Sequence, residues 1–347
     1  MSTWLVSLKP LAPYFFGGEQ NYTFGGKDQP YFICSEKMPA QSTLLGMLRY
    51  VVLKRHKLLN RSPKETVDLI GPESFDMACG NSQEFGIIKK LSPVFLLDGD
   101  GQKYVPVPLN HKKGEKNYTP LRMKSVPAAV KTTPRISLLP LDYCVKTGLP
   151  DGMLCLQGRK VIPGGEIFKP RVQVGIRKRR PGENSLESSF FKKEFIELNA
   201  DYHFAFYAKM DEPPLDTVVF LGQGKSPFQM TSKEEEDGLE AEVRQKLGTL
   251  NRSNEPFSYA LSDVKMTREP YEYTGFSIDQ AKPYRYQKTK NFSAENYWDK
   301  IGKSEKLFTL VRAGSVFYVR DKAGFETCCQ NKELEEVGFN HMIEIGG

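Results

Sequence analysis

The chain has 347 residues, of which 39% are hydrophobic and 12% aromatic, so its composition supports a packed core and excludes an intrinsically disordered protein. No apolar run approaches the roughly 20 residues that span a bilayer. The first residues, Met1 to Leu8, are typical of a β-strand rather than of a secretory signal. We therefore expect a soluble cytoplasmic protein, and the length suggests two ordinary domains.

The six cysteines form neither a CxxC pair nor a ladder with histidines, which is the spacing that zinc sites usually need. They are Cys34, Cys79, Cys144, Cys155, Cys328 and Cys329. We expect reduced structural thiols, with no metal and no cofactor. The adjacent pair Cys328-Cys329 is expected on a loop or a strand edge.

Basic residues are concentrated in two stretches, although the net charge of the chain is only +7. Residues 103–135 hold eight Lys or Arg against one Glu, and residues 159–193 hold ten against three. The rest of the chain is therefore net acidic. One such stretch is equally well explained as a solvated loop, but two in an otherwise acidic chain favour a polyanionic partner, namely nucleic acid.

In chain order, the alternation at Trp4–Leu8 predicts a first strand, and a loop rich in glycine and aromatics follows. The aromatic residues of this region form either a partner surface or part of the core: Phe15, Phe16, Tyr31 and Phe32. Apolar residues recur at helical spacing between Pro39 and Leu53. Gln41-Ser42 is a plausible N-cap, which leaves the helix N-terminus free to meet an anion.

Strand signals then dominate, with few helices and without regular alternation of strand and helix, so we predict an α+β fold. Residues 98–165 are expected to form an irregular basic insertion, and the acidic run 233–242 a surface helix start or linker. The predicted strands are 172–177, 190–198, 202–209, 218–221, 259–266 and a final one, 308–312 continuing into 316–319.

The motifs of common enzymes are absent from this sequence. The Gly222–Ser226 stretch ends in Gly-Lys-Ser but fails as a P-loop, because Val219 stands where a glycine is required. A metal-independent ribonuclease needs only one histidine with a second acid or base. His111, in the basic loop, and His341 are the candidates for that alternative, and a solvated His111 in an RNA-contacting loop is the competing interpretation.

Cations, aromatics and glycines interleave as RNA binding requires: cations neutralise phosphates, flat rings stack on bases, and bare backbone amides cradle phosphate oxygens. The combination predicts single-stranded or irregular RNA held by its backbone. The candidate RNA-binding residues are Gln41, Ser42, Thr43, Arg49, Lys131, Arg135, Arg171, Arg177, Lys178, Arg179, Gly222, Gly224, Lys225 and Ser226.

Several of these stretches resemble RAMP proteins and, more narrowly, the Cas5-like handle-binding subunit of Cmr-type (type III-B) CRISPR complexes. The sequence departs from the family pattern at two places. Its glycine-rich loop has fewer glycines, and Asn340-His341 stands where a further glycine is common. The matching stretches are Leu8–Gly18, Met38–Arg49, Val172–Ile176 with Glu183–Leu186, Leu221–Phe228, and Arg312–Tyr318 with Glu336–His341.

The resemblance implies two ferredoxin-like (RRM-related) domains, which we place at residues 1–230 and 231–347. It implies a non-catalytic subunit that grips the 5′ handle of the crRNA in antiviral defence. Its partners would be the large polymerase/cyclase subunit and the adjacent backbone RAMP subunit. Two alternatives remain: a RAMP-type endoribonuclease that processes precursor crRNA, and the equivalent, Csm-like subunit of another type III complex.

Overall fold

The structure is a computed structural model that describes residues 1–21, 31–59, 61–79, 82–126, 138–143, 146, 148–176, 190–222, 224–251, 255–289 and 301–346. Five of the candidate RNA-binding residues lie outside the described residues: Lys131, Arg135, Arg177, Lys178 and Arg179.

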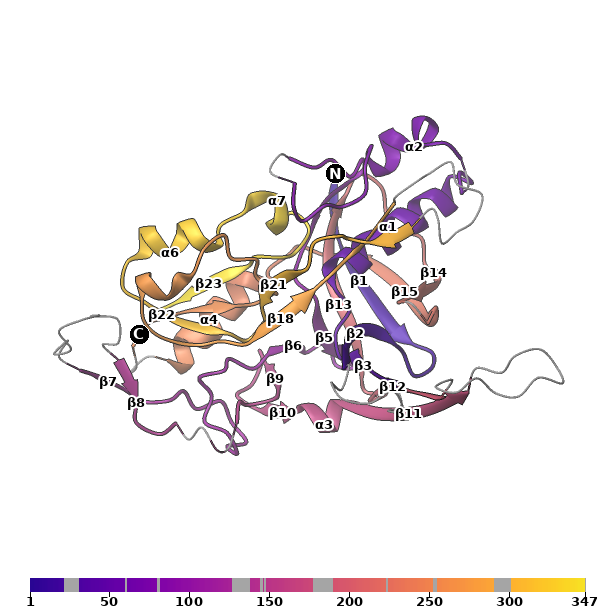
Figure 1. Cartoon of the computed structure of the whole chain (residues 1–347). Helices are drawn as coiled ribbons and strands as arrows, with labels where there is room; N and C mark the ends of the chain where they lie inside the picture. Colours follow the sequence, from indigo (N-terminus) through magenta and orange to yellow (C-terminus); the bar gives the residue numbers. More distant parts are fainter. Residues whose placement is uncertain are drawn as a thin grey trace.

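A nine-stranded antiparallel sheet forms the centre of the first two thirds of the chain (Figure 1). Its strands follow the order β10-β9-β6-β5-β13-β1-β15-β14, and β4 also pairs with β13. The strands are β1 (Ser2–Pro10), β4 (Ile88–Leu91), β5 (Phe95–Asp98), β6 (Lys103–Pro106), β9 (Gly152–Cys155), β10 (Val161–Pro163), β13 (Tyr202–Met210), β14 (Thr217–Leu221) and β15 (Ser226–Glu234).

A second sheet of four strands has the order β11-β12-β3-β2, in which β12 and β3 run parallel. Its long hairpin, β11–β12, extends away from the body of the molecule (Figure 1). The strands are β2 (Phe16–Asn21), β3 (Tyr31–Glu36), β11 (Phe168–Ile176) and β12 (Phe190–Leu198).

The C-terminal sheet has the order β17-β22-β16-β23 and is antiparallel throughout. Its strands are β16 (Phe257–Ala260), β17 (Thr274–Ile278), β22 (Val316–Val319) and β23 (Met342–Ile345). Three strand pairs complete the set: β7 (Met123–Ser125) with β8 (Leu138–Pro140), β18 (Ala281–Tyr284) with β21 (Phe308–Val311), and β19 (Gln287–Thr289) with β20 (Ile301–Lys303).

The described helices are short apart from two: α1 (Gln41–Arg55) and α4 (Leu239–Leu250). The others are α2 (Pro63–Ile70), α3 (Gly164–Ile167), α6 (Lys322–Cys329), α7 (Lys332–Glu335) and the 3₁₀ helix η2 (Pro270–Tyr273). Among the described residues, no helix has both the length and the apolar composition needed to cross a membrane.

The two faces of the large sheet bury different cores because side chains alternate along each strand. On one face, Val6 and Phe204 pack with Leu44 and Leu48 of α1 in a single cluster. On the other face, Leu5 and Tyr207 join Val243 of α4 and Tyr259 of the C-terminal sheet. The predicted division near residue 230 stays a prediction, and the residues on its two sides share both clusters.

The α+β prediction is confirmed, and strands cover most of the predicted positions. The predicted N-cap is wrong: α1 begins at Gln41 after Ala40, without a side-chain cap. The predicted strand 259–266 has the wrong bounds: β16 begins at Phe257 and already ends at Ala260. The predicted final strand is two strands, β21 and β22, separated by a turn, and β23 follows them.

Burial and strand pairing correct two further expectations and decide one open alternative. Cys328 and Cys329 are buried in α6 rather than on a loop or an edge, because that helix packs its apolar side against the C-terminal sheet. Phe15 and Phe16 are core residues, which decides between the two interpretations of these side chains. Within the stretch 98–165, strands β6, β9 and β10 belong to the large sheet.

Candidate RNA interface

The glycine-rich stretch forms the turn of the hairpin β14–β15, where Leu221 pairs with Ser226. Gly222 has a φ of +71°, and a Cβ there would lie 2.1 Å from the carbonyl oxygen of Phe15, so only glycine fits. The amide of Lys225 donates to the carbonyl of Gly222 over 3.1 Å and closes the turn. Gln223 lies outside the described residues.

Ser226 fixes this turn to the loop after β1. Its hydroxyl accepts a hydrogen bond from the amide of Phe15 over 3.1 Å, and the side chain is buried. The Ser226 hydroxyl, predicted to bind RNA, therefore holds the turn in place. Gly224 and Lys225 are exposed, and Lys225 has a φ of +48°.

Lys193, on β12, meets the hairpin from another part of the chain. Its Nζ lies 3.7 Å from the ring centroid of Phe15 and 4.9 Å from that of Phe195, which is a cation–π arrangement. A Cβ at Gly224 would lie 3.6 Å from the same nitrogen. Burial lowers the pKa of Lys193, and within the described chain no carboxylate pairs with it.

The hairpin β11–β12 extends this cationic surface. Arg171 is opposite Phe195 and Gln173 is opposite Lys193, so all four side chains are on one face of the antiparallel pair. Arg171 forms an ion pair with Glu197 and its side chain is 60% exposed. Arg171 was predicted from the sequence as an RNA-binding residue, whereas Lys193 was not. The signal was its position two residues before Phe195 in a clear strand pattern.

The N-terminus of α1 is not free, contrary to the expectation from sequence. Ser42 shares a 2.6 Å hydrogen bond between its hydroxyl and that of Tyr284, and Gln41 is buried. Thr43 donates its amide to the carbonyl of Ala40 over 2.9 Å. The C-terminal part of the chain therefore covers the first turn of this helix.

Beside that turn is a crevice of about 380 Å³ between the large sheet and the C-terminal part of the chain. Charged side chains from both parts line it: Glu36, Lys37, Asp151, Asp263, Lys282 and Arg312. Arg49, further along α1, is half-buried, and burial lowers its pKa.

Lys282 is the most buried cation of the crevice. Its Nζ lies 2.8 Å from Asp263 and 3.7 Å from Glu36. Burial alone would lower the pKa of Lys282, but the two carboxylates outweigh it and hold that pKa above its ordinary value. Arg312 reaches the same Glu36 carboxylate at 3.3 Å.

The two histidines considered for catalysis, His111 and His341, are both buried. His111 is buried, stacks on Tyr118 with ring centroids 5.7 Å apart, and accepts the amide of Thr119 at Nδ1. Burial lowers its pKa. The interpretation of His111 as a solvated loop residue is therefore wrong. His341 is buried as well and contacts Glu240 and the carbonyl of Glu335.

Residues 6–345 match the model of the family described as CRISPR-associated protein (Cas_Cmr3). This chain belongs to the Cmr3 family. The RAMP, type III-B resemblance is thereby confirmed, and with it the predicted class of protein, a subunit of a type III CRISPR effector complex.

Solved structures are similar to this Cmr3-family chain, and the first of the two below shares its fold. A chain of the type III-B Cmr-beta complex bound to cognate target RNA, solved by cryo-EM, aligns with a TM-score of 0.51 and 10% identity, covering 98% of this chain and 96% of that one. A chain of the same complex with AMPPnP aligns with a TM-score of 0.49 and 11% identity, covering 97% and 95%. A comparison with curated protein sequences gave no match.

Proposed function

We propose that this chain grips the 5′ handle of a crRNA and caps the base of its effector complex as a non-catalytic subunit. One observation carries the proposal: Lys193, the ring of Phe15 and the Gly222–Ser226 turn converge at one place, although they come from three separate parts of the sequence. A partly desolvated ammonium without a carboxylate partner is stabilised when a phosphate approaches it.

The handle backbone would cross the turn and follow the exposed face of the β11–β12 hairpin. Backbone N–H groups of the turn would donate hydrogen bonds to phosphate oxygens, and Lys193 and Arg171 would neutralise the negative charge of the phosphates. Phe195, on the same face of the hairpin, offers an aromatic ring for a splayed base. At the crevice, the Lys282 side chain is only 12% exposed and lies between two carboxylates, one of which also holds Arg312, so we assign this pair of cations to contact between the domains; Arg171, by contrast, is 60% exposed.

We further propose that the chain contains two ferredoxin-like (RRM-related) domains that meet near residue 230. Strand order supports this: β1 is flanked by β13 and β15, with β5 beyond β13, and β16 is flanked by β22 and β23, with β17 beyond β22. In both sheets the first strand thus lies between the third and the last, as in the ferredoxin-like motif.

The partners we propose are the large polymerase/cyclase subunit and the adjacent backbone RAMP subunit. The similarity to a chain of the type III-B Cmr-beta complex, a multi-subunit assembly solved with cognate target RNA, supports neighbouring protein subunits and RNA as partners. The buried environments of His111 and His341 support a non-catalytic role, because a general acid or base must reach its substrate.

The test is a fluorescence anisotropy titration of handle RNA against scrambled RNA, at two salt concentrations, with a gel for cleavage. Lys193→Ala is expected to weaken handle binding about five- to ten-fold and to reduce the slope of log K against log salt by about 0.7, the value for one phosphate contact on a single strand. Lys64→Ala, at an exposed lysine of α2, is the matched control and should leave both quantities unchanged.

Equal binding of handle and scrambled RNA, or an unaltered salt slope in Lys193→Ala, would contradict the proposed interface. Metal-free cleavage of the RNA by the wild-type chain would overturn the non-catalytic assignment and favour the processing enzyme.

A further inference from the structure

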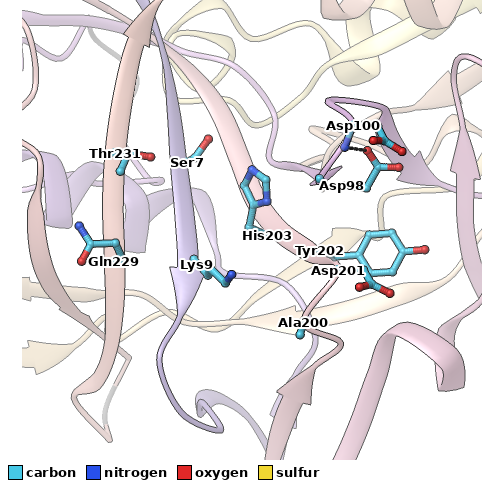
Figure 2. A pocket seen from close by; sticks show the side chains of 11 residues that line it. Ser7, Lys9, Asp98, Asp100, Ala200, Asp201, Tyr202, His203, Gln229 and Thr231 are labelled. Atoms are coloured by element: carbon cyan, nitrogen blue, oxygen red, sulfur yellow. Dashed lines mark hydrogen bonds between the residues drawn. The ribbon is translucent and has the colours of Figure 1, made fainter.

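A hollow of about 710 Å³ opens on the face of the large sheet that is opposite α1. Ser7 and Lys9 of β1 lie at its centre, between His203 of β13 and Gln229 with Thr231 of β15 (Figure 2). Asp98, Asp100 and Asp201 stand at the side of β13. None of the described residues assigned to the RNA interface lines this hollow.

Strand register explains the polar floor. Ser7 is opposite Thr231 and Lys9 is opposite Gln229, so these side chains share a face with Leu5 and Tyr207 further along the strands. The latter two are buried in the cluster that contains α4. The helix therefore covers one end of this sheet face and leaves the other end open.

The open end continues into exposed apolar side chains on the edge strand β14. Val218 is opposite Gln229 and is 38% exposed, while Phe220 is opposite Pro227 and is 61% exposed. Leu11, whose amide donates to the carbonyl of Pro227, is 54% exposed. Apolar groups gathered beside a polar hollow are typical of a surface that binds a partner.

Charge indicates what kind of partner fits. Asp100 and Asp201 have no cationic partner in the part of the chain that the structure describes, and Lys9 is the one Lys or Arg that lines the hollow. Burial, together with nearby Lys9, lowers the pKa of His203. The lining thus carries net negative charge, which repels phosphates and attracts a cationic side chain.

We propose that this open sheet face docks an extended segment of a protein partner, with an apolar side chain against Phe220 and a Lys or Arg side chain against Asp100 and Asp201. Neighbouring strands lie about 4.8 Å apart, so the three steps from β14 to β13 span roughly 14 Å. An extended chain covers that distance in about four residues. The two anchoring side chains should therefore be separated by about that number of positions.

The experiment titrates the full chain into a labelled five-residue peptide that begins with phenylalanine, ends with arginine and has serine or threonine between them. A matched peptide ends with glutamate instead. The arginine peptide is expected to bind about ten-fold more tightly, since attraction to the carboxylates becomes repulsion in the control. Octauridylate is the third probe and is expected to ignore this face.

Two variants locate the binding. Asp100→Asn with Asp201→Asn should remove the difference between the peptides, and Phe220→Ser should weaken both of them. Both variants should bind handle RNA as the wild type does, which shows that they fold. Equal affinity of the wild type for the two peptides, or octauridylate binding that Phe220→Ser abolishes, would overturn the proposal, the latter in favour of a nucleic-acid surface.

Discussion

At the scale of single residues, the hairpin turn depends on a position where a side chain cannot exist. Gly222 combines a left-handed backbone with the close approach of the Phe15 carbonyl, and Ser226 ties the same two segments together. These two contacts hold the turn against the segment that follows β1. The turn should therefore be sensitive to any substitution that adds a Cβ at Gly222.

Gly222→Ala should therefore lower the free energy of unfolding by about 1–3 kcal/mol and weaken handle binding, because the added Cβ displaces either the turn or Phe15. Urea denaturation and anisotropy measure the two effects. Gly248→Ala is the control, since a Cβ at this position of α4 meets nothing within 4 Å. It should stabilise the chain by up to about 1 kcal/mol. A Gly222→Ala protein as stable as the control variant would refute this account.

At the scale of elements, a buried ion network connects strand β3 to the C-terminal part of the chain. Glu36 belongs to β3, Lys282 to β18, and Asp263 to the segment after β16. The Lys282 side chain is only 12% exposed, so little water solvates its ammonium group. The carboxylate partners therefore supply most of the stabilisation of that charge. Burial raises the pKa of Asp263, but Lys282 outweighs this and holds it below its ordinary value.

Lys282→Met is expected to lower the free energy of unfolding by about 3 kcal/mol, because it leaves the Asp263 carboxylate without its cation in a buried site. Adding Asp263→Asn should recover at least about 1 kcal/mol of that loss. Lys322→Met breaks an exposed ion pair with Glu344 and should cost less than about 1 kcal/mol. Similar losses for Lys282→Met and Lys322→Met, measured by urea denaturation, would show that the network is not stabilising.

At the scale of the whole molecule, the proposed domains share their cores. Val243 of α4 and Tyr259 of β16 pack with Leu5 and Tyr207 of the large sheet, and all four are buried. On the opposite face, Phe339 joins the cluster that contains α1. Neither domain can separate without exposing apolar surface, which costs roughly 25 cal/mol per Å².

The chain should consequently unfold in one cooperative transition. Val243→Ala, which creates a cavity at the shared core, should shift the whole transition by about 1–3 kcal/mol rather than split it. Calorimetry of the full chain is the measurement. Two separate endotherms, with only the second one moved by the substitution, would mean that the domains fold independently.

The sequence by itself determined the features that depend on neighbours along the chain. Alternation defined β12 and β13 to within a residue, helical spacing defined α1, and the motifs identified the family, since each pattern is local. The candidate residues Arg171, Gly222, Gly224 and Lys225 were also selected from local composition, and their part in RNA binding stays a proposal.

Only the tertiary structure decided which of these features meet. Lys193 reaches Phe15 and the glycine turn, Tyr284 covers the start of α1, and His111 is buried rather than solvated. These contacts join residues far apart in sequence, and neither periodicity nor composition contains information about such pairs. The packing of the sheets determines these contacts, because apolar faces are buried against each other and their side chains must fit together closely.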